Sequence, residues 1–174
     1  MTRPEALTAA LFAVAAVACS PSLDWREFMA DGVGVVASFP CRPDRHMRAV
    51  RLDGSTVQME MLVCTAAGAT FALSIVDVAD PARVASTLAE LRAIAQANVQ
   101  GEPPQVVGFQ VRGMTPNPQA VQLALVGRLP DGASVQLHAA FFSHGLRLYQ
   151  ATVIGAWPPD EAAQTFFAGF RFPP

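Results

Sequence analysis

The chain has 174 residues, of which 52% are hydrophobic and 15% are charged, and its formal net charge is −2 at pH 7. This length suits one domain with a substantial core, and the composition excludes an intrinsically disordered chain. The small net charge gives no reason to expect nucleic acid as a partner, and the absence of Lys excludes Schiff-base chemistry.

Residues 1–18 have the form of a secretory signal peptide. Arg3 supplies a positive charge, and residues 6–18 then run without any charge. A membrane-spanning helix needs about 20 apolar residues, so this run is too short to cross a bilayer and suits the apolar region of a signal peptide. No later stretch has the length and hydropathy of a stop-transfer helix. The sequence therefore predicts an exported protein without a membrane span.

Cys19 directly follows the small-x-small cleavage site Ala16-Val17-Ala18. This arrangement resembles the lipobox of bacterial lipoproteins, although Ala16 stands where that family prefers Leu, Val or Ile. The resemblance implies a diacylglycerol with fatty acids such as palmitate on Cys19. A short lipidated tether over 19–24 would then lead to a single domain over 25–174. Ser20 implies sorting to the periplasmic side of the outer membrane. The alternative is a plainly secreted protein with a free N-terminal thiol.

The number of cysteines supports lipidation, because Cys19, Cys41 and Cys64 make an odd set. An unpaired thiol is unusual in an oxidising compartment, and lipidation of Cys19 leaves the other two free to pair. We expect a structural disulfide between Cys41 and Cys64, with free buried thiols as the alternative. The sequence lacks a C-x-x-C motif, which argues against a thiol oxidoreductase.

The first half of the mature chain predicts four strands and a helix. The strands are expected over 33–39, 46–52, 56–64 and 69–78, from apolar runs or alternation between turn residues. Asp80 is a suitable N-cap and Pro81 a suitable first helical residue. The residues that follow at helical spacing are apolar and form one stripe. These are Val84, Leu88, Leu91 and Ala95.

The second half predicts four more strands, over 105–112, 120–129, 133–142 and 146–154, and a closing helix after 158–159. Tight turns separate the last three strands, which indicates an antiparallel meander. The buried face of the closing helix is expected to comprise Ala163, Phe166, Phe167 and Phe170. The predicted fold is therefore α+β, in the order β4-α-β4-α, with both helices packed on one side of an antiparallel sheet.

The segment Phe39-Pro40-Cys41-Arg42-Pro43 and the following hairpin, which is rich in Val and Met, resemble PsbP/Mog1-like domains. Proteins of this family often carry a Phe-Pro-Gly-x-Pro segment, in which Gly stands where this chain has Cys41. The family includes photosystem accessory proteins and a small-GTPase binder. The resemblance implies a non-enzymatic accessory or binding module, and none of the family's functional residues can be assigned here.

The polar residues give little support to catalysis. His46, His138 and His144 are isolated in the sequence and lack the local pairing of metal ligands, so we expect no metal and no cofactor. Ser143 and His144 suggest a nucleophile and a base, with Asp77 as a third member. Neighbours in a turn seldom point at each other, however, and no G-x-S-x-G motif is present. A small periplasmic hydrolase that uses Ser143 and His144 is therefore only the alternative function.

A cluster of arginines is the most distinctive surface feature of the sequence. Strand alternation would divide these side chains between two faces, so a solvated hairpin is the simplest interpretation. The alternative is a surface that contacts anionic lipid head groups or an acidic partner. The cluster comprises Arg42, Arg45, Arg48 and Arg51.

In all, the sequence predicts a membrane-anchored, non-catalytic module that binds a protein or envelope component of unknown identity.

Overall fold

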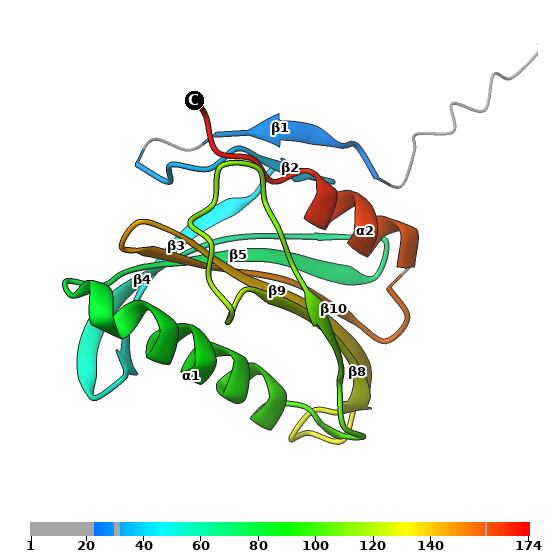
Figure 1. Cartoon of the computed structure of the whole chain (residues 1–174). Coiled ribbons are helices and arrows are strands. Elements are labelled where there is room, and N and C mark those ends of the chain that lie inside the picture. Colours follow the sequence, from blue (N-terminus) through cyan, green and yellow to red (C-terminus); the bar gives the residue numbers. More distant parts are fainter. Residues whose placement is uncertain (1–22, 30–31, 159) are drawn as a thin grey trace, which may run out of the picture.

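Two antiparallel meanders lie side by side and form the central sheet of the protein (Figure 1). The computed structural model describes residues 23–29, 32–158 and 160–174. The first meander comprises β3 (Asp44–Leu52), β4 (Ser55–Ala66) and β5 (Ala69–Asp77). The second comprises β8 (Val121–Arg128), β9 (Ser134–His144) and β10 (Arg147–Gly155). Antiparallel pairing of β5 with β10 joins them, with Asp77 opposite Arg147.

The two edges of this eight-stranded sheet differ in length. At one edge, β6 (Gln100–Gly101) and β7 (Gln105–Gly108) each pair with part of β8. At the other edge lies β3, which pairs with β4 along its whole length. The predicted meander of the last three strands is confirmed, and the first half of the chain contains a matching one.

One face of the sheet is covered by a single long helix. After a short 3-10 turn (η1, Pro81–Arg83), α1 runs over Val84–Ala97. Asp80 caps the turn, because its carboxylate accepts a hydrogen bond from the backbone N–H of Ala82 at 2.9 Å. The stripe predicted from the sequence is buried against the sheet, which confirms the helix and its inward face.

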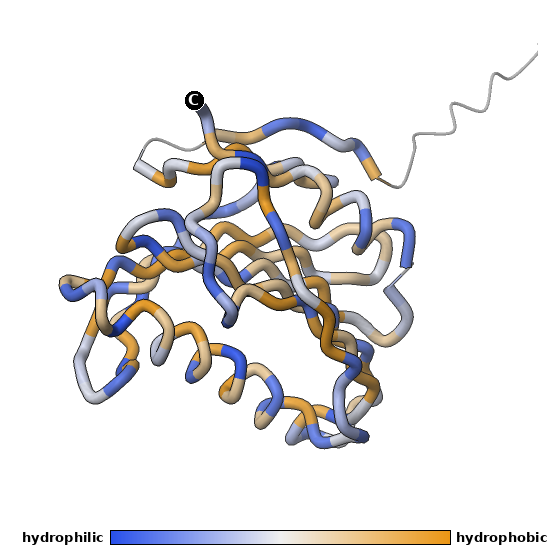
Figure 2. Tube along the Cα trace, in the orientation of Figure 1, coloured by the Kyte–Doolittle hydropathy of each residue, from blue (hydrophilic) through white to orange (hydrophobic). Residues whose placement is uncertain are grey.

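The opposite face, which we call the aromatic face, is covered by several short segments from distant parts of the chain. These are β1 (Arg26–Phe28), β2 (Ala37–Phe39), the connection 109–120, α2 (Asp160–Ala168) and the tail 169–174. β1 and β2 form a separate two-stranded sheet, and Val36 and Arg112 each bridge to Arg171. The aromatic side chains buried there are Phe39, Phe71, Phe142, Tyr149, Phe166, Phe167, Phe170 and Phe172. Figure 2 shows that hydrophobic segments concentrate in the central strands, with hydrophilic ones at the turns.

The predicted α+β class in the order β4-α-β4-α is wrong. Of the described residues, 49% are in strands or bridges and only 17% are helical, and eight strands share one antiparallel sheet. The two helices pack on opposite faces, not on one side (Figure 1). The reason lies in the strands themselves, because successive side chains of β9 such as Phe141 and Phe142 are both buried. A strand that is apolar on both faces needs a cover on both.

Two predicted strands are shorter than expected. Only Ala37–Phe39 of the run 33–39 forms a strand, because Gly34 takes a positive φ of 75° that breaks the extended backbone. Of the run 105–112, only Gln105–Gly108 is a strand. In both cases the apolar residues are buried as parts of connections, since Val33, Val35 and Val111 all belong to the core.

Candidate functional site

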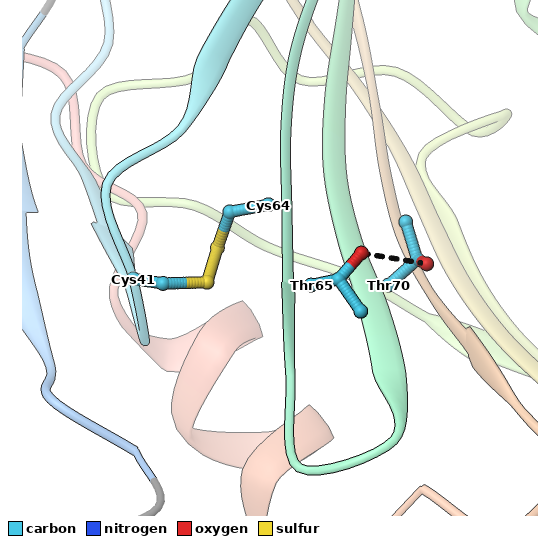
Figure 3. Close-up of a disulfide and its surroundings, with 4 residues drawn as sticks. All are labelled: Cys41, Cys64, Thr65 and Thr70. Atoms are coloured by element: carbon cyan, nitrogen blue, oxygen red, sulfur yellow. Dashed lines mark hydrogen bonds between the residues drawn. A yellow bond between two sulfur atoms is a disulfide. The ribbon is translucent and has the colours of Figure 1, made fainter.

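A disulfide joins the layer that contains β1, β2 and α2 to the central sheet (Figure 3). Cys41 follows β2 and Cys64 lies in β4, and their Cα atoms are 6.0 Å apart. The predicted pairing is therefore confirmed. In the neighbouring position of β4, the hydroxyls of Thr65 and Thr70 lie 3.3 Å apart within hydrogen-bonding distance. Because both sulfurs are bonded, neither of these cysteines is available as a nucleophile or as a metal ligand.

The proposed lipid-acceptor residue lies outside the described part of the chain. Residues 1–22, which include the predicted signal peptide and Cys19, are among those that the structure does not describe. Contacts with the folded body are seen from Leu23, which packs against the aromatic core, and from Asp24, whose N–H bonds to the carbonyl of Pro40 at 2.9 Å. Within the described residues, none of the helices has the length and hydropathy needed to cross a membrane.

The side chain of Arg147 links three segments: β10, on which it lies, β5 and the connection that precedes β2. Its guanidinium contacts both carboxylate oxygens of Asp77, at 2.6 and 2.8 Å, and also donates to the carbonyl of Gly32. Next to it, the hydroxyl of Tyr149 donates to the carbonyl of Val33 at 2.8 Å. The hydrogen bond with Asp77 raises the pKa of Arg147, and burial raises the pKa of Tyr149 to about 12. These bonds hold the connection ahead of β2, which helps to cover the aromatic face, against the sheet.

The proposed pair of Ser143 and His144 does not form a catalytic dyad. Alternation along β9 points the two side chains to opposite faces of the sheet. Ser143 is fully buried, and its hydroxyl has no hydrogen-bond partner among the described residues. The ring of His144 instead stacks on Phe172 with centroids 4.4 Å apart, and its Nδ1 lies 2.8 Å from the carbonyl oxygen of Gly113. Asp77, the imagined third member, is paired with Arg147.

His138 lines a groove beside the first turn of α2. Two adjoining hollows of about 340 and 360 Å³ share Gln136 and Asp160, and Trp157, 80% exposed, stands at one of them. The Nε2 atom of His138 is 3.6 Å from a carboxylate oxygen of Asp160. Burial lowers the pKa of His138, and the carboxylate offsets part of this shift. Among the described residues, no group of three or more His, Cys, Asp or Glu could hold a metal ion.

The four clustered arginines occupy the open edge of the sheet. Arg42 precedes β3, and the others lie within it. Arg48 is on the face of the sheet that α1 covers, and Arg45 and Arg51 are on the aromatic face, so alternation divides them as expected. Arg45 forms an ion pair with Glu60 of β4. His46 is also on this strand, with its side chain exposed.

Sequence reasoning missed two features of these sites. Nothing near Arg147 in the sequence signals the links that its side chain makes, because its partners Asp77 and Gly32 lie far away along the chain. The groove at His138 likewise depends on Asp160, which tertiary packing brings to β9. The many charges of β3 are typical of an edge strand, but its place at the open edge is set by the strand pairing of the whole sheet.

No protein-family model matches the chain, and no curated protein matches its sequence. The resemblance to PsbP/Mog1-like domains and the resemblance to lipoproteins therefore both stay predictions. What the chain does must be argued from its own residues.

Proposed function

We propose that the chain is a lipoprotein of the bacterial cell envelope, anchored through Cys19 on the periplasmic side of the outer membrane. Its folded part acts there as a non-catalytic accessory or binding module for a protein or another envelope component. The observation that carries this proposal is the disulfide between Cys41 and Cys64. It uses both of the other cysteines and leaves Cys19 as the single cysteine outside the pair.

The position of Cys19 gives that remaining thiol a role. It follows an uncharged run that suits a signal peptide and a small-x-small cleavage site. A disulfide is itself favoured in exported proteins, so the pair at Cys41 and Cys64 supports the same compartment. Two or three acyl chains would make a stable anchor, because each buried CH₂ contributes about 0.8 kcal/mol.

The fold would hold the module close to the lipid surface. Leu23 already packs against the core beside Trp25 and the first turn of α2. An extended chain covers at most about 3.6 Å per residue, so the four steps from Cys19 to Leu23 reach about 14 Å. A partner would therefore have to be another component at or near the same membrane.

Replacement of the acceptor residue tests the anchor. The whole protein is expressed with its own leader in a Gram-negative host, and the membrane and soluble periplasmic fractions are compared. We expect the wild-type protein in the membrane fraction with fatty acids on its N-terminal peptide by mass spectrometry. Cys19→Ala should move into the soluble fraction or remain as an uncleaved precursor without fatty acids.

Ser20→Ala is the matched control, since it changes the adjacent residue and leaves the acceptor thiol in place. We expect this variant to carry the same acyl groups as the wild-type protein and to remain with the membrane. A wild-type N-terminus without fatty acid, or acylation that persists in Cys19→Ala, would overturn the proposal.

A further inference from the structure

The outer side of β3 offers unpaired backbone groups for a partner strand. Its register with β4 is continuous from Asp44 to Leu52, and a two-residue turn, Asp53–Gly54, closes the hairpin with positive φ at both positions. In such a hairpin the two residues that flank the turn, Leu52 and Ser55, exchange hydrogen bonds. The N–H of Leu52, and of every second residue before it, therefore points toward β4. The N–H groups of Met47, Ala49 and Arg51 therefore point outward, where no described strand pairs with them.

Both ends of this edge are held in place. At the turn, Arg83 donates to the carboxylate of Asp53 at 3.0 Å and to its carbonyl at 2.6 Å. Ser86 adds a further hydrogen bond to the same carboxylate at 3.0 Å. At the other end, the disulfide of Cys41 holds the segment that enters β3. An edge held at both ends loses little conformational entropy when another strand pairs with it.

The charge of the edge differs from that of the whole molecule. The formal net charge of the chain is −2, yet residues 42–51 contain four Arg and a single acidic residue, Asp44. Glu60 pairs with Arg45, but no ion pair joins Arg48 or Arg51 to another described residue. Met47, 62% exposed, adds an apolar side chain next to Arg45 on the aromatic face. Carboxylates would complement this surface on both faces of an added strand.

From this geometry we infer that β3 binds an extended acidic segment of a partner protein, which adds to the sheet as a further strand. This deepens the binding module proposed above and rests on it. The outward N–H groups would donate hydrogen bonds to the added strand and the outward carbonyls would accept them, which supplies affinity. Arg48 and Arg51 would select carboxylates. A second copy of the chain fits less well, because pairing β3 with another β3 would bring like charges together.

A peptide of alternating acidic and β-forming residues tests the inference on the full-length lipidated protein in detergent. The probe is Glu-Glu-Val-Thr-Glu-Glu-Val-Thr, labelled for fluorescence anisotropy, and its Lys counterpart is the charge control. We expect the Glu peptide to bind at low salt and the Lys peptide not to bind. Amide hydrogen exchange should slow at Met47, Ala49 and Arg51 when the Glu peptide is present.

Substitutions on the edge separate strand addition from simple charge attraction. Ala49→Pro removes one outward N–H without breaking a bond to β4, so it should weaken peptide binding about tenfold. Ala49→Thr keeps the N–H and should change affinity less than about twofold. Arg48→Gln and Arg51→Gln, which leave the backbone unchanged, should each weaken binding about fivefold at low salt. Arg92→Gln on α1 is the matched charge control.

Several outcomes would overturn the inference. They are no binding of the Glu peptide, equal binding of the Lys peptide, or loss with the arginine variants but not with Ala49→Pro. Binding only to vesicles that contain phosphatidylglycerol would assign the arginines to lipid, and a dimer that Ala49→Pro dissociates would assign the edge to a second copy. Membrane fractionation reports the anchor separately, so failure of the peptide test leaves the Cys19 result intact.

Discussion

The two faces of the central sheet are covered in different ways. Among the described residues buried on the α1 face, Phe141 is the single aromatic side chain, and one continuous helix covers most of the strands. The opposite face carries a cluster of aromatic rings under five short segments from distant parts of the chain. Tyr149, Arg147 and the disulfide add polar and covalent links on that side.

The difference shows what a layer of short segments needs. A helix such as α1 satisfies its own backbone and brings a complete apolar stripe to the sheet. The segments of the aromatic face, for example β1 and β2, are too short to be stable alone. Large rings in edge-to-face contact and links across the chain compensate for the lack of local structure. Variants on the two faces should therefore have unequal effects.

The largest effect is expected from Phe166→Ala on the aromatic face. This ring is fully buried, and its centroid lies 5.2 Å from that of Phe39 and 5.5 Å from that of Phe71. Its loss leaves a cavity between α2, β2 and β5, so we expect the free energy of unfolding to fall by about 4 kcal/mol. Chemical denaturation of the purified protein measures this free energy. A loss of less than about 2 kcal/mol would contradict the prediction.

A smaller effect is expected from Leu88→Ala on the other face. Leu88 of α1 is fully buried against the sheet. We expect its aliphatic neighbours to move partly into the space that it leaves. We expect a loss of about 3 kcal/mol in the free energy of unfolding. Ile94→Ala, at a position of the same helix that is 41% exposed, is the control and should change stability by much less, about 0.5 kcal/mol. A larger loss at Leu88 than at Phe166 would break the comparison.

Removal of the disulfide should affect the two faces unequally. The paired change Cys41→Ser with Cys64→Ser opens a loop with a sequence separation of 23 residues, so stability should fall by about 2–3 kcal/mol. Amide hydrogen exchange should rise first in β1 and β2, whereas α1 should keep its protection. Equal deprotection of both regions would show that the two layers unfold as one unit.

The smallest expected effect is a loss of stability at alkaline pH, which arises on the aromatic face alone. The chain has one Tyr and no Lys, and burial raises the pKa of Tyr149 to about 12 from 10.0. The unfolded chain ionises first, so stability is complete below pH 10 and falls as the pH rises from about 10 to about 12. Tyrosinate absorbance and denaturation at each pH measure this. Tyr149→Phe should abolish this fall in stability with pH. A fall that remains in this variant would show that another group causes it.

The sequence allowed prediction of those elements whose signals are local. Asp80 and Pro81 mark the start of the helical segment, its apolar stripe indicates the buried face, and turns such as Asp53–Gly54 separate the strands. Of the cover of the aromatic face, the closing helix was predicted, but the small sheet was not, because β1 is formed by Arg26–Phe28, three residues without a distinctive pattern. The apolar run 139–142 did indicate burial on both sides, and this signal argues against placing both helices on one face.

The candidate sites follow the same division. Cysteine number was sufficient to predict the bond between Cys41 and Cys64, since one partner was available once Cys19 was assigned elsewhere. The arginine cluster was visible as a run, but its place at the open margin of the sheet depends on which strand pairs with which. Ser143 and His144 were expected in a turn, whereas β9 continues to His144, so strand alternation separates the two side chains.

The bridges from Arg171 to Val36 and to Arg112 have a consequence for biosynthesis. A polypeptide that crosses the membrane from its N-terminus presents Val36 and Arg112 well before Arg171. Until then, the rings of the aromatic face lack one of their covering segments, whereas both α1 and the strands it packs on are already available. This step of folding therefore waits for Arg171, and earlier intermediates should expose these rings to chaperones.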